Sequence, residues 1–156
     1  MKKIIIYDLD GTIIDSSHRA RHIDGKLDLE HWKANSTKEN IFADDLLPLY
    51  WQLRQDWLDG HHIVLCTARE MSKYDKEYLQ LMNIPYNTLI SRPVGNTLPD
   101  SELKKKRLSR FFNLKWTWGR EKIFYDDNQK NLADVSLLGV EPRYAPNFNS
   151  GILKAW

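Results

Sequence analysis

Residues 3–12 read Lys-Ile-Ile-Ile-Tyr-Asp-Leu-Asp-Gly-Thr, a short apolar run that ends in two acidic residues and a glycine. The run is nearly continuous rather than alternating, which is typical of a strand buried on both faces of a parallel sheet. Asp8 and Asp10 follow the carboxyl end of that strand, and Gly11 allows a tight turn with close approach of backbone N–H groups. Two carboxylates at one strand end cost solvation energy unless a cation compensates them, and Mg²⁺ prefers such oxygen ligands.

The rest of the chain continues this pattern of strands and helices. Further apolar runs occur at 63–66, 88–90, 123–125 and, more weakly, 140–144. Helix-length patterns lie at about 45–59, 72–82, 100–112 and 128–138. Strands that alternate with helices predict an α/β fold with a doubly wound parallel sheet. Such folds place their chemistry at the carboxyl ends of the strands.

The segment at about residues 12–43 interrupts this alternation. It is polar, rich in His and Arg, and contains one short helical pattern near 29–34. We expect it to be a small insertion over the site rather than a full cap domain. The helix that follows is expected to be capped by Asp44 or Asp45 and to end at Gly60. Its apolar face is predicted to consist of Leu46, Leu49, Tyr50, Leu53 and Trp57.

The composition is that of one globular domain, expected over residues 1–156. A chain of 156 residues, 42% of them apolar, is long enough for one core and too short for two ordinary enzyme domains. The net charge of +2 gives no strong case for a nucleic-acid or membrane partner, and no partner protein is implied. Asp8 ends the first apolar run too early for a secretion signal. Cys66, the only cysteine, lies in an apolar run, which predicts a core thiol and a cytoplasmic location.

Later motifs place further polar groups at the same edge of the predicted sheet. Thr67 and Arg69 follow the second strand, and their hydroxyl and guanidinium groups suit a phosphate. Asp126 and Asp127 follow the fourth strand and repeat the acidic pair of the first. Together with an inward-facing lysine, these groups predict a site that holds a metal ion and a phosphate.

Lys104 is that lysine. At about 100° per residue, the apolar residues from Leu103 to Phe112 form an arc, and Lys104 projects near the centre of it. A lysine that faces the core needs an anionic partner or a ligand. The other cations of this region suit either an ordinary solvated surface or, with two tryptophans between them, a track for a nucleic-acid backbone. These residues are Lys105, Lys106, Arg110, Lys115, Trp116, Trp118 and Arg120.

In the order of its motifs the chain resembles the haloacid dehalogenase (HAD) superfamily of phosphotransferases. The motifs span nearly the whole chain and are Asp8-Leu9-Asp10-Gly11-Thr12, Thr67, Lys104 and Asp126-Asp127. More narrowly, the chain is similar to the phosphatase domain of phage-type polynucleotide kinase/3′-phosphatases and their stand-alone relatives. The residues that carry this narrower likeness are 8–12, 15–19, 67–69, 91–93 and 100–104. The resemblance implies a Rossmann-like three-layer sandwich with a mainly parallel central sheet. It also implies that the cytoplasm in question is that of a bacterium or an infected host cell.

The resemblance also implies a role for each acidic residue of the motifs. Asp8 is expected to be the nucleophile that forms an aspartyl-phosphate. Asp10 is expected to protonate the leaving oxygen and then to activate water. Mg²⁺ is expected to be held by Asp8, the backbone carbonyl of Asp10 and Asp126, with Asp127 in support.

By the same resemblance, the remaining residues contact the phosphate or the rest of the substrate. Thr67 and Lys104 are expected to hold the phosphoryl oxygens, together with backbone N–H groups of the turn at Gly11. The expected substrate-binding arginines are Arg69, Arg19 and Arg92, and Asp100 is expected to orient one of them.

The expected activity is Mg²⁺-dependent removal of 3′-phosphates from polynucleotide ends. No Gly-x-x-x-x-Gly-Lys-Ser/Thr motif occurs in the sequence, so the kinase half of the bifunctional enzymes is absent. A nucleotidase for free (deoxy)nucleoside monophosphates is the alternative with the same chemistry. A non-catalytic domain that binds nucleic acid or accepts a phosphoryl group is the alternative from another class. The expected partner is accordingly a phosphorylated nucleic-acid end or a nucleotide.

Overall fold

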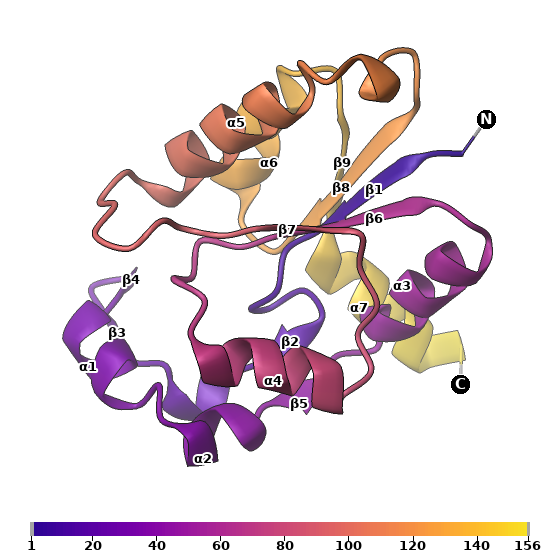
Figure 1. Cartoon of the computed structure of the whole chain (residues 1–156). Coiled ribbons are helices and arrows are strands. Elements are labelled where there is room, and N and C mark those ends of the chain that lie inside the picture. Colours follow the sequence, from indigo (N-terminus) through magenta and orange to yellow (C-terminus); the bar gives the residue numbers. More distant parts are fainter. Residues whose placement is uncertain (1, 156) are drawn as a thin grey trace.

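A five-stranded sheet forms the centre of the computed structural model, which describes the backbone of residues 2–155 and the side chains of residues 2–151 (Figure 1). Each pair of neighbouring strands in this sheet is parallel. In spatial order the strands are β7 (Thr88–Ile90), β6 (His62–Cys66), β1 (Ile4–Tyr7), β8 (Lys122–Asp126) and β9 (Glu141–Tyr144). The predicted α/β fold and its parallel sheet are therefore confirmed.

β1 lies between β6 and β8, which explains its continuous apolar sequence. Tyr7 pairs with Leu65 on one side and with Tyr125 on the other. The side chains of Ile4–Tyr7 are at most 2% exposed, so the strand is buried on both faces. Cys66 at the end of β6 is also buried, and burial raises the pKa of its thiol to about 12. It is the core thiol that its sequence context predicts.

Helices cover both faces of the sheet and complete a three-layer sandwich (Figure 1). On one face, α5 (Asp100–Phe111) and α6 (Gln129–Ser136) pack against the even-numbered residues of β1. On the other face lie α3 (Leu49–Leu58), α4 (Lys73–Leu81) and α7 (Ala145–Ala155). α4, α5 and α6 match predicted helices, whereas α7 has no counterpart among them. No helix of the described residues is long and apolar enough to cross a membrane.

The predicted insertion contains more structure than the single short helix expected there. The expected helix is α1 (Leu29–Ala34), and α2 (Lys38–Phe42) follows it. β3 (His22–Ile23) and β4 (Lys26–Leu27) form a small hairpin before them. Its turn is Asp24-Gly25, with φ of 51° and 77°, and an Asp-Gly pair with two positive φ values is a typical hairpin turn. α2, β3 and β4 are too short to produce a periodic signal in the sequence.

The start of α3 corrects the predicted capping by Asp44 or Asp45. Asp45 and Leu46 form the short strand β5, which pairs antiparallel with β2 (Ile14–Asp15) at the base of the insertion. α3 begins only after Pro48, a residue that suits the first turn of a helix. Trp57, predicted to face the core, is 39% exposed.

Asp56 takes a buried position on α3 because Tyr7 supplies a hydrogen bond there. The Tyr7 hydroxyl donates to Asp56 Oδ2 at 2.6 Å, and the Gln52 side-chain amide donates to Asp56 Oδ1 at 2.9 Å. Replacing Tyr7 with Phe is expected to lower the free energy of unfolding by about 1–2 kcal/mol, because a buried carboxylate oxygen loses its donor. Urea denaturation measures this, with Tyr86→Phe at a half-exposed position as the control. An unchanged midpoint would show that this bond does not stabilise the fold.

Candidate active site

Three carboxylates meet at the carboxyl edge of the sheet. Asp8 follows β1, Asp126 ends β8 and Asp127 comes directly after it. These side chains offer oxygen atoms that all lie within 4.8 Å of one another. Asp8 and Asp126 are buried, whereas Asp127 is exposed. Asp8 of the first acidic pair is thus brought together with both residues of the second pair.

Lys104 lies between two of these carboxylates and is 2% exposed. Its Nζ donates to Asp8 Oδ1 at 2.8 Å and to Asp126 Oδ2 at 2.7 Å. Burial alone would lower the pKa of the ammonium group, but Asp8 and Asp126 raise it above its ordinary value. Lys104 therefore stays charged and faces inward from α5, as its place in the apolar arc predicts.

The carboxylates nevertheless carry more negative charge than one lysine compensates. Burial and the nearby charge of Asp126 raise the pKa of Asp8 well above its ordinary value. The loss of water around its carboxyl group, followed by the nearby charge of Asp126, raises the pKa of Asp127 to about 6. Three clustered carboxylates facing one ammonium group suit a hard divalent cation, so the donor set fits Mg²⁺.

The Asp10 carboxylate points at Arg69. Only the backbone carbonyl of Asp10 is therefore left to bind the metal ion, as the resemblance implies. Arg69 donates through Nε to Asp10 Oδ2 at 2.7 Å and through Nη2 to Asp10 Oδ1 at 2.5 Å. Ser16 Oγ donates to the same Oδ1 at 2.6 Å. Burial alone would raise the pKa of Asp10, but the charge and hydrogen bonds of Arg69 bring it below its ordinary value. In this structure Asp10 is therefore a carboxylate.

The two other predicted arginines already have protein acceptors. Arg19, in the insertion, is 2% exposed and donates to Asp44 and Ser36. Arg92 donates through all three of its side-chain nitrogens to carbonyl or carboxylate oxygens, among them Asp100 Oδ1 at 2.8 Å. The pairing of Arg92 with Asp100 is the orienting contact expected from the sequence.

The position of Gly11 excludes any larger residue because the Asp127 carboxylate lies against it. Its φ is +78°, and a Cβ atom added here would lie 2.1 Å from Asp127 Oδ2. Thr12, one residue on, donates from Oγ1 to Asp8 Oδ2 at 3.1 Å. Thr67 Oγ1 accepts the backbone N–H of Arg69 at 3.1 Å, which fixes the turn after β6.

A Gly11→Ala variant is expected to lose at least about ten-fold in kcat, because the new methyl group must displace the Asp127 carboxylate and strain the turn. Steady-state phosphate release measures the loss. Gly95→Ala is the matched control, since Gly95 also has a positive φ of 80° but no neighbouring atom within 4 Å of an added Cβ. Equal losses in both variants would mean that the contact with Asp127 has no part in the effect.

Several polar residues that support the site were not predicted from the sequence. Thr12 and Ser16 donate to Asp8 and Asp10. Asn131 Nδ2 donates to Asp126 Oδ2 at 3.2 Å. Asp44 and Asp75 accept hydrogen bonds from Arg69 at 3.4 and 2.8 Å. Asp75 also caps α4 with Ser72, which is the only role that its sequence context indicates.

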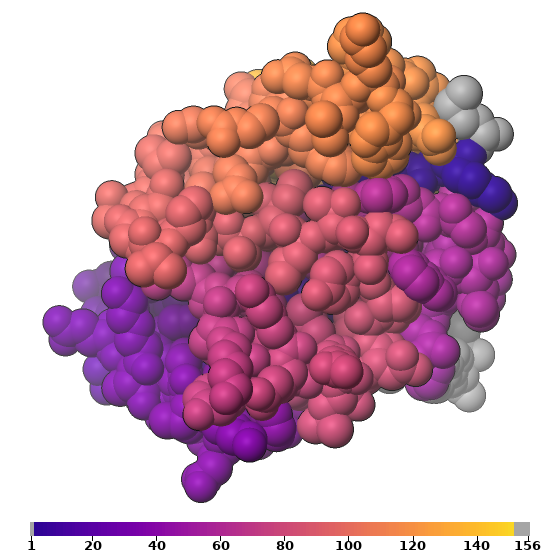
Figure 2. Space-filling view, in the orientation of Figure 1, coloured from indigo at the N-terminus to yellow at the C-terminus, as the bar shows by residue number. Residues whose placement is uncertain are grey.

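The insertion reaches this site from one side. Figure 2 shows the insertion, in violet, next to the loop that includes residues 92–99, in salmon, at the same end of the molecule. By contrast, Trp116 lies against His62 at the start of β6, with ring centroids 4.6 Å apart. The part of the predicted track that follows α5 therefore lies at the amino ends of the strands, away from the site, whereas Lys105, Lys106 and Arg110 lie on α5 itself.

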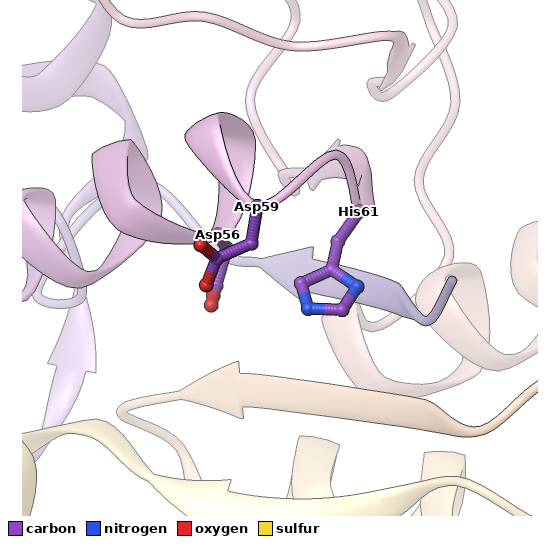
Figure 3. Close-up of side chains that lie close together, drawn as sticks. All are labelled: Asp56, Asp59 and His61. Carbon is purple, nitrogen blue, oxygen red and sulfur yellow. The ribbon is translucent and has the colours of Figure 1, made fainter. Parts of the chain in front are cut away.

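A second group of potential metal ligands lies at that opposite edge (Figure 3). It consists of Asp56, Asp59 and His61. His61 Nδ1 accepts the backbone N–H of Lys3 at 3.0 Å, so the neutral ring carries its proton on Nε2. A protonated Nε2 does not ligate a metal, and Asp56 is already bonded to Tyr7 and Gln52. This group therefore suits a structural role.

The parallel sheet and the helices on its two faces are similar to those of solved structures of the HAD superfamily. A chain of the Pnkp1/Rnl/Hen1 RNA repair complex has a TM-score of 0.68 at 19% identity, over 92% of this chain and 42% of that chain. A HAD-like hydrolase from Streptococcus pneumoniae also has a TM-score of 0.68, at 12% identity, over 90% of this chain and 83% of that one. The HAD domain of effector protein Lem4 from Legionella pneumophila has a TM-score of 0.57 at 19% identity, over 98% and 94%. These likenesses confirm the predicted HAD fold.

The sequence family of bacteriophage T5 5′-deoxynucleotidase matches residues 1–153, and the chain belongs to this family. Over 85 residues it is 42% identical to the 5′-deoxynucleotidase of Escherichia phage T5. That stretch is 51% of this chain and 35% of the phage protein, so the match spans about a third of the relative's length. The description of this family is that of a phosphoric monoester hydrolase, in agreement with the predicted class. The family name agrees with the nucleotidase alternative rather than with a 3′-phosphatase.

Proposed function

We propose that the chain is a Mg²⁺-dependent phosphomonoesterase that hydrolyses deoxynucleoside 5′-monophosphates. The observation that carries the proposal is the meeting of Asp8, Lys104, Asp126 and Asp127 at one sheet edge in a member of this family. We further propose that residues 1–156 act as one phosphatase domain.

In the first step, a carboxylate oxygen of Asp8 attacks the phosphorus atom. The bond from phosphorus to the nucleoside 5′ oxygen breaks, and Asp10 gives that oxygen a proton. In the second step, water attacks the phosphorus of the aspartyl-phosphate and Asp10 takes a proton from the water. The bond from phosphorus to the Asp8 oxygen breaks, and phosphate leaves. Asp8 is then restored, so the cycle balances.

The remaining residues hold the phosphoryl group during both steps. Lys104, Thr67 and the backbone N–H groups around Gly11 stabilise its oxygens. Asp8, Asp126, Asp127 and the backbone carbonyl of Asp10 would hold Mg²⁺. Neutralisation of charge on the phosphoryl oxygens is the chemistry that this ion supplies when bound.

Arg69 links substrate binding to the protonation of Asp10. Its two hydrogen bonds favour the carboxylate form of Asp10, which is the form needed to activate water. The negative charge of a substrate phosphate beside Arg69 offsets the charge of the guanidinium group. This favours the protonated form of Asp10 needed in the first step, while Arg69 stays in place. Arg92 contacts the rest of the substrate by exchanging its present acceptors, whereas Arg19, which is buried and paired with Asp44, holds the insertion in place.

The position of the cations supports a free nucleotide over a polynucleotide end. The surface residues that suit a nucleic-acid backbone, Trp116 and Trp118 with Arg120, lie towards the amino ends of the strands. In the insertion, Arg19 is paired with Asp44 and Arg21 with Asp28.

Phosphate release in Mg²⁺ from four matched substrates tests the proposal. These are deoxynucleoside 5′- and 3′-monophosphates and oligonucleotides phosphorylated at the 5′ or 3′ end. We expect the 5′-mononucleotide to give the highest kcat/KM and a chelator to stop release. Preference for the 3′-phosphorylated oligonucleotide would assign the chain to end repair instead, and no release from any substrate would contradict both assignments.

A further inference from the structure

We propose that Asp44 is a positioning residue that fixes Asp10 through Arg69 and so ties the insertion to the chemistry of the site. The inference rests on the proposed function, since it concerns the proton that Asp10 gives to the leaving oxygen. Asp44 comes just before β5, at the base of the insertion, and its side chain has no exposed surface.

Asp44 is bonded to the insertion on both of its carboxylate oxygens. Arg19 donates through Nε to Oδ1 at 3.0 Å and through Nη2 to Oδ2 at 2.9 Å. His18 Nε2 lies 2.7 Å from Oδ1. The Asp44 backbone carbonyl accepts the Tyr78 hydroxyl at 2.7 Å, which anchors this point to α4. Asp44 is therefore held in one position from both sides.

The same Oδ2 atom accepts Arg69 Nη2 at 3.4 Å, which places two buried guanidinium groups side by side. Arg69 donates to three carboxylates, those of Asp10, Asp44 and Asp75. Asp44 and Asp75 lie on the protein side and Asp10 on the side of the site. Because a guanidinium group is planar, acceptors on two of its edges fix the direction of the third.

Trp32 covers this network from the insertion. Its ring centroid lies 4.1 Å from the Arg19 guanidinium carbon and 5.5 Å from that of Arg69. Arg19 also donates to Ser36 Oγ at 3.1 Å, two residues before α2 begins. Asp44 is thus the acidic group that both holds the insertion, through Arg19, and orients Arg69.

An Asp44→Asn variant distinguishes a positioning role from a loss of folded protein, because only a positioning role makes the loss of kcat depend on the leaving group. A nucleoside alkoxide is a poor leaving group that needs the proton of Asp10, whereas p-nitrophenolate leaves without one. We expect kcat for a deoxynucleoside 5′-monophosphate to fall at least about 30-fold and kcat for p-nitrophenyl phosphate to fall less than about three-fold. Asp45→Asn, at the adjacent exposed position, is the control and should alter neither.

Equal losses on the two substrates would overturn the proposal, because lost folded protein or lost phosphate binding lowers both rates together. Circular dichroism checks the folded fraction of each variant. If Asp44→Asn does not fold, Asp44→Glu keeps the charge but shifts the carboxylate, and the same unequal loss is expected of it. If the natural chain hydrolyses p-nitrophenyl phosphate and no deoxynucleotide, the proposed function fails, and the comparison is made with whichever alkyl phosphate it hydrolyses.

Discussion

Replacing Asp8 with Asn is expected to lower phosphate release at least about 1,000-fold, because a carboxamide is not a nucleophile towards phosphorus. The substitution keeps the shape of the side chain. The one carboxamide oxygen takes the place of Oδ1, which accepts from Lys104, and the NH2 group takes the place of Oδ2, where the Thr12 hydroxyl accepts instead of donating. Burial and Asp126 already disfavour the charged form of Asp8 in the folded protein. The free energy of unfolding at neutral pH should therefore not fall, and the loss of turnover should be purely chemical.

The control for this variant is Asp59→Asn, which removes a carboxylate at the opposite edge of the sheet. Steady-state kinetics and urea denaturation of both variants give the comparison. If Asp8→Asn retained more than a few per cent of the natural kcat, another group would have to be the nucleophile.

Replacing Lys104 with Met is expected to affect stability and activity together. The variant leaves Asp8 and Asp126 buried without their shared ammonium group, which costs about 3–5 kcal/mol of unfolding free energy when a chelator is present. Mg²⁺ should restore part of this stability, since it replaces the lost positive charge. The kcat should fall at least about 100-fold in Mg²⁺, because the phosphoryl oxygens lose a charged donor.

Lys105→Met is the matched control, because Lys105 is the next residue on α5 and is more exposed than Lys104. Urea denaturation with chelator and with Mg²⁺ measures how much of the loss of unfolding free energy depends on the metal ion. A stability loss that Mg²⁺ does not reduce would contradict a cation site beside Lys104.

The sheet and the acidic edge of the site are predictable from the sequence because they depend on local patterns. β1 is a continuous apolar run that ends directly in Asp8 and Asp10, and β8 ends in Asp126 and Asp127. The inward position of Lys104 follows from helical periodicity alone. These features require no knowledge of contacts between distant residues.

The support of the site is not predictable in the same way, because it consists of ion pairs between distant residues. Arg69 joins Asp10, Asp44 and Asp75, which come from three different segments. Asp44 looks like a helix cap in the sequence, yet β5 intervenes before α3 begins. A short strand of two residues leaves no periodic signal that could reveal this.

The sequence motifs also do not predict which substrate the site accepts. The carboxylates, Thr67 and Lys104 handle the phosphoryl group, which is the same in a nucleotide and in a polynucleotide end. What differs is the group attached to it, and the structure describes no contact with that group. The part of the insertion shown near Arg69 is Trp32, whose ring centroid lies 5.5 Å from the Arg69 guanidinium carbon. The family match over residues 1–153, rather than any motif, favours the 5′-nucleotide.

The most direct test of the account is to look for the phosphorylated Asp8 itself. The protein is mixed with a deoxynucleoside 5′-monophosphate that carries a radioactive phosphoryl group, in Mg²⁺, and quenched in acid within one turnover. We predict label on the peptide that contains Asp8, released by hydroxylamine as expected of an acyl-phosphate, and no label on Asp8→Asn. Turnover of the substrate with label on no residue, or on a residue other than Asp8, would contradict the account.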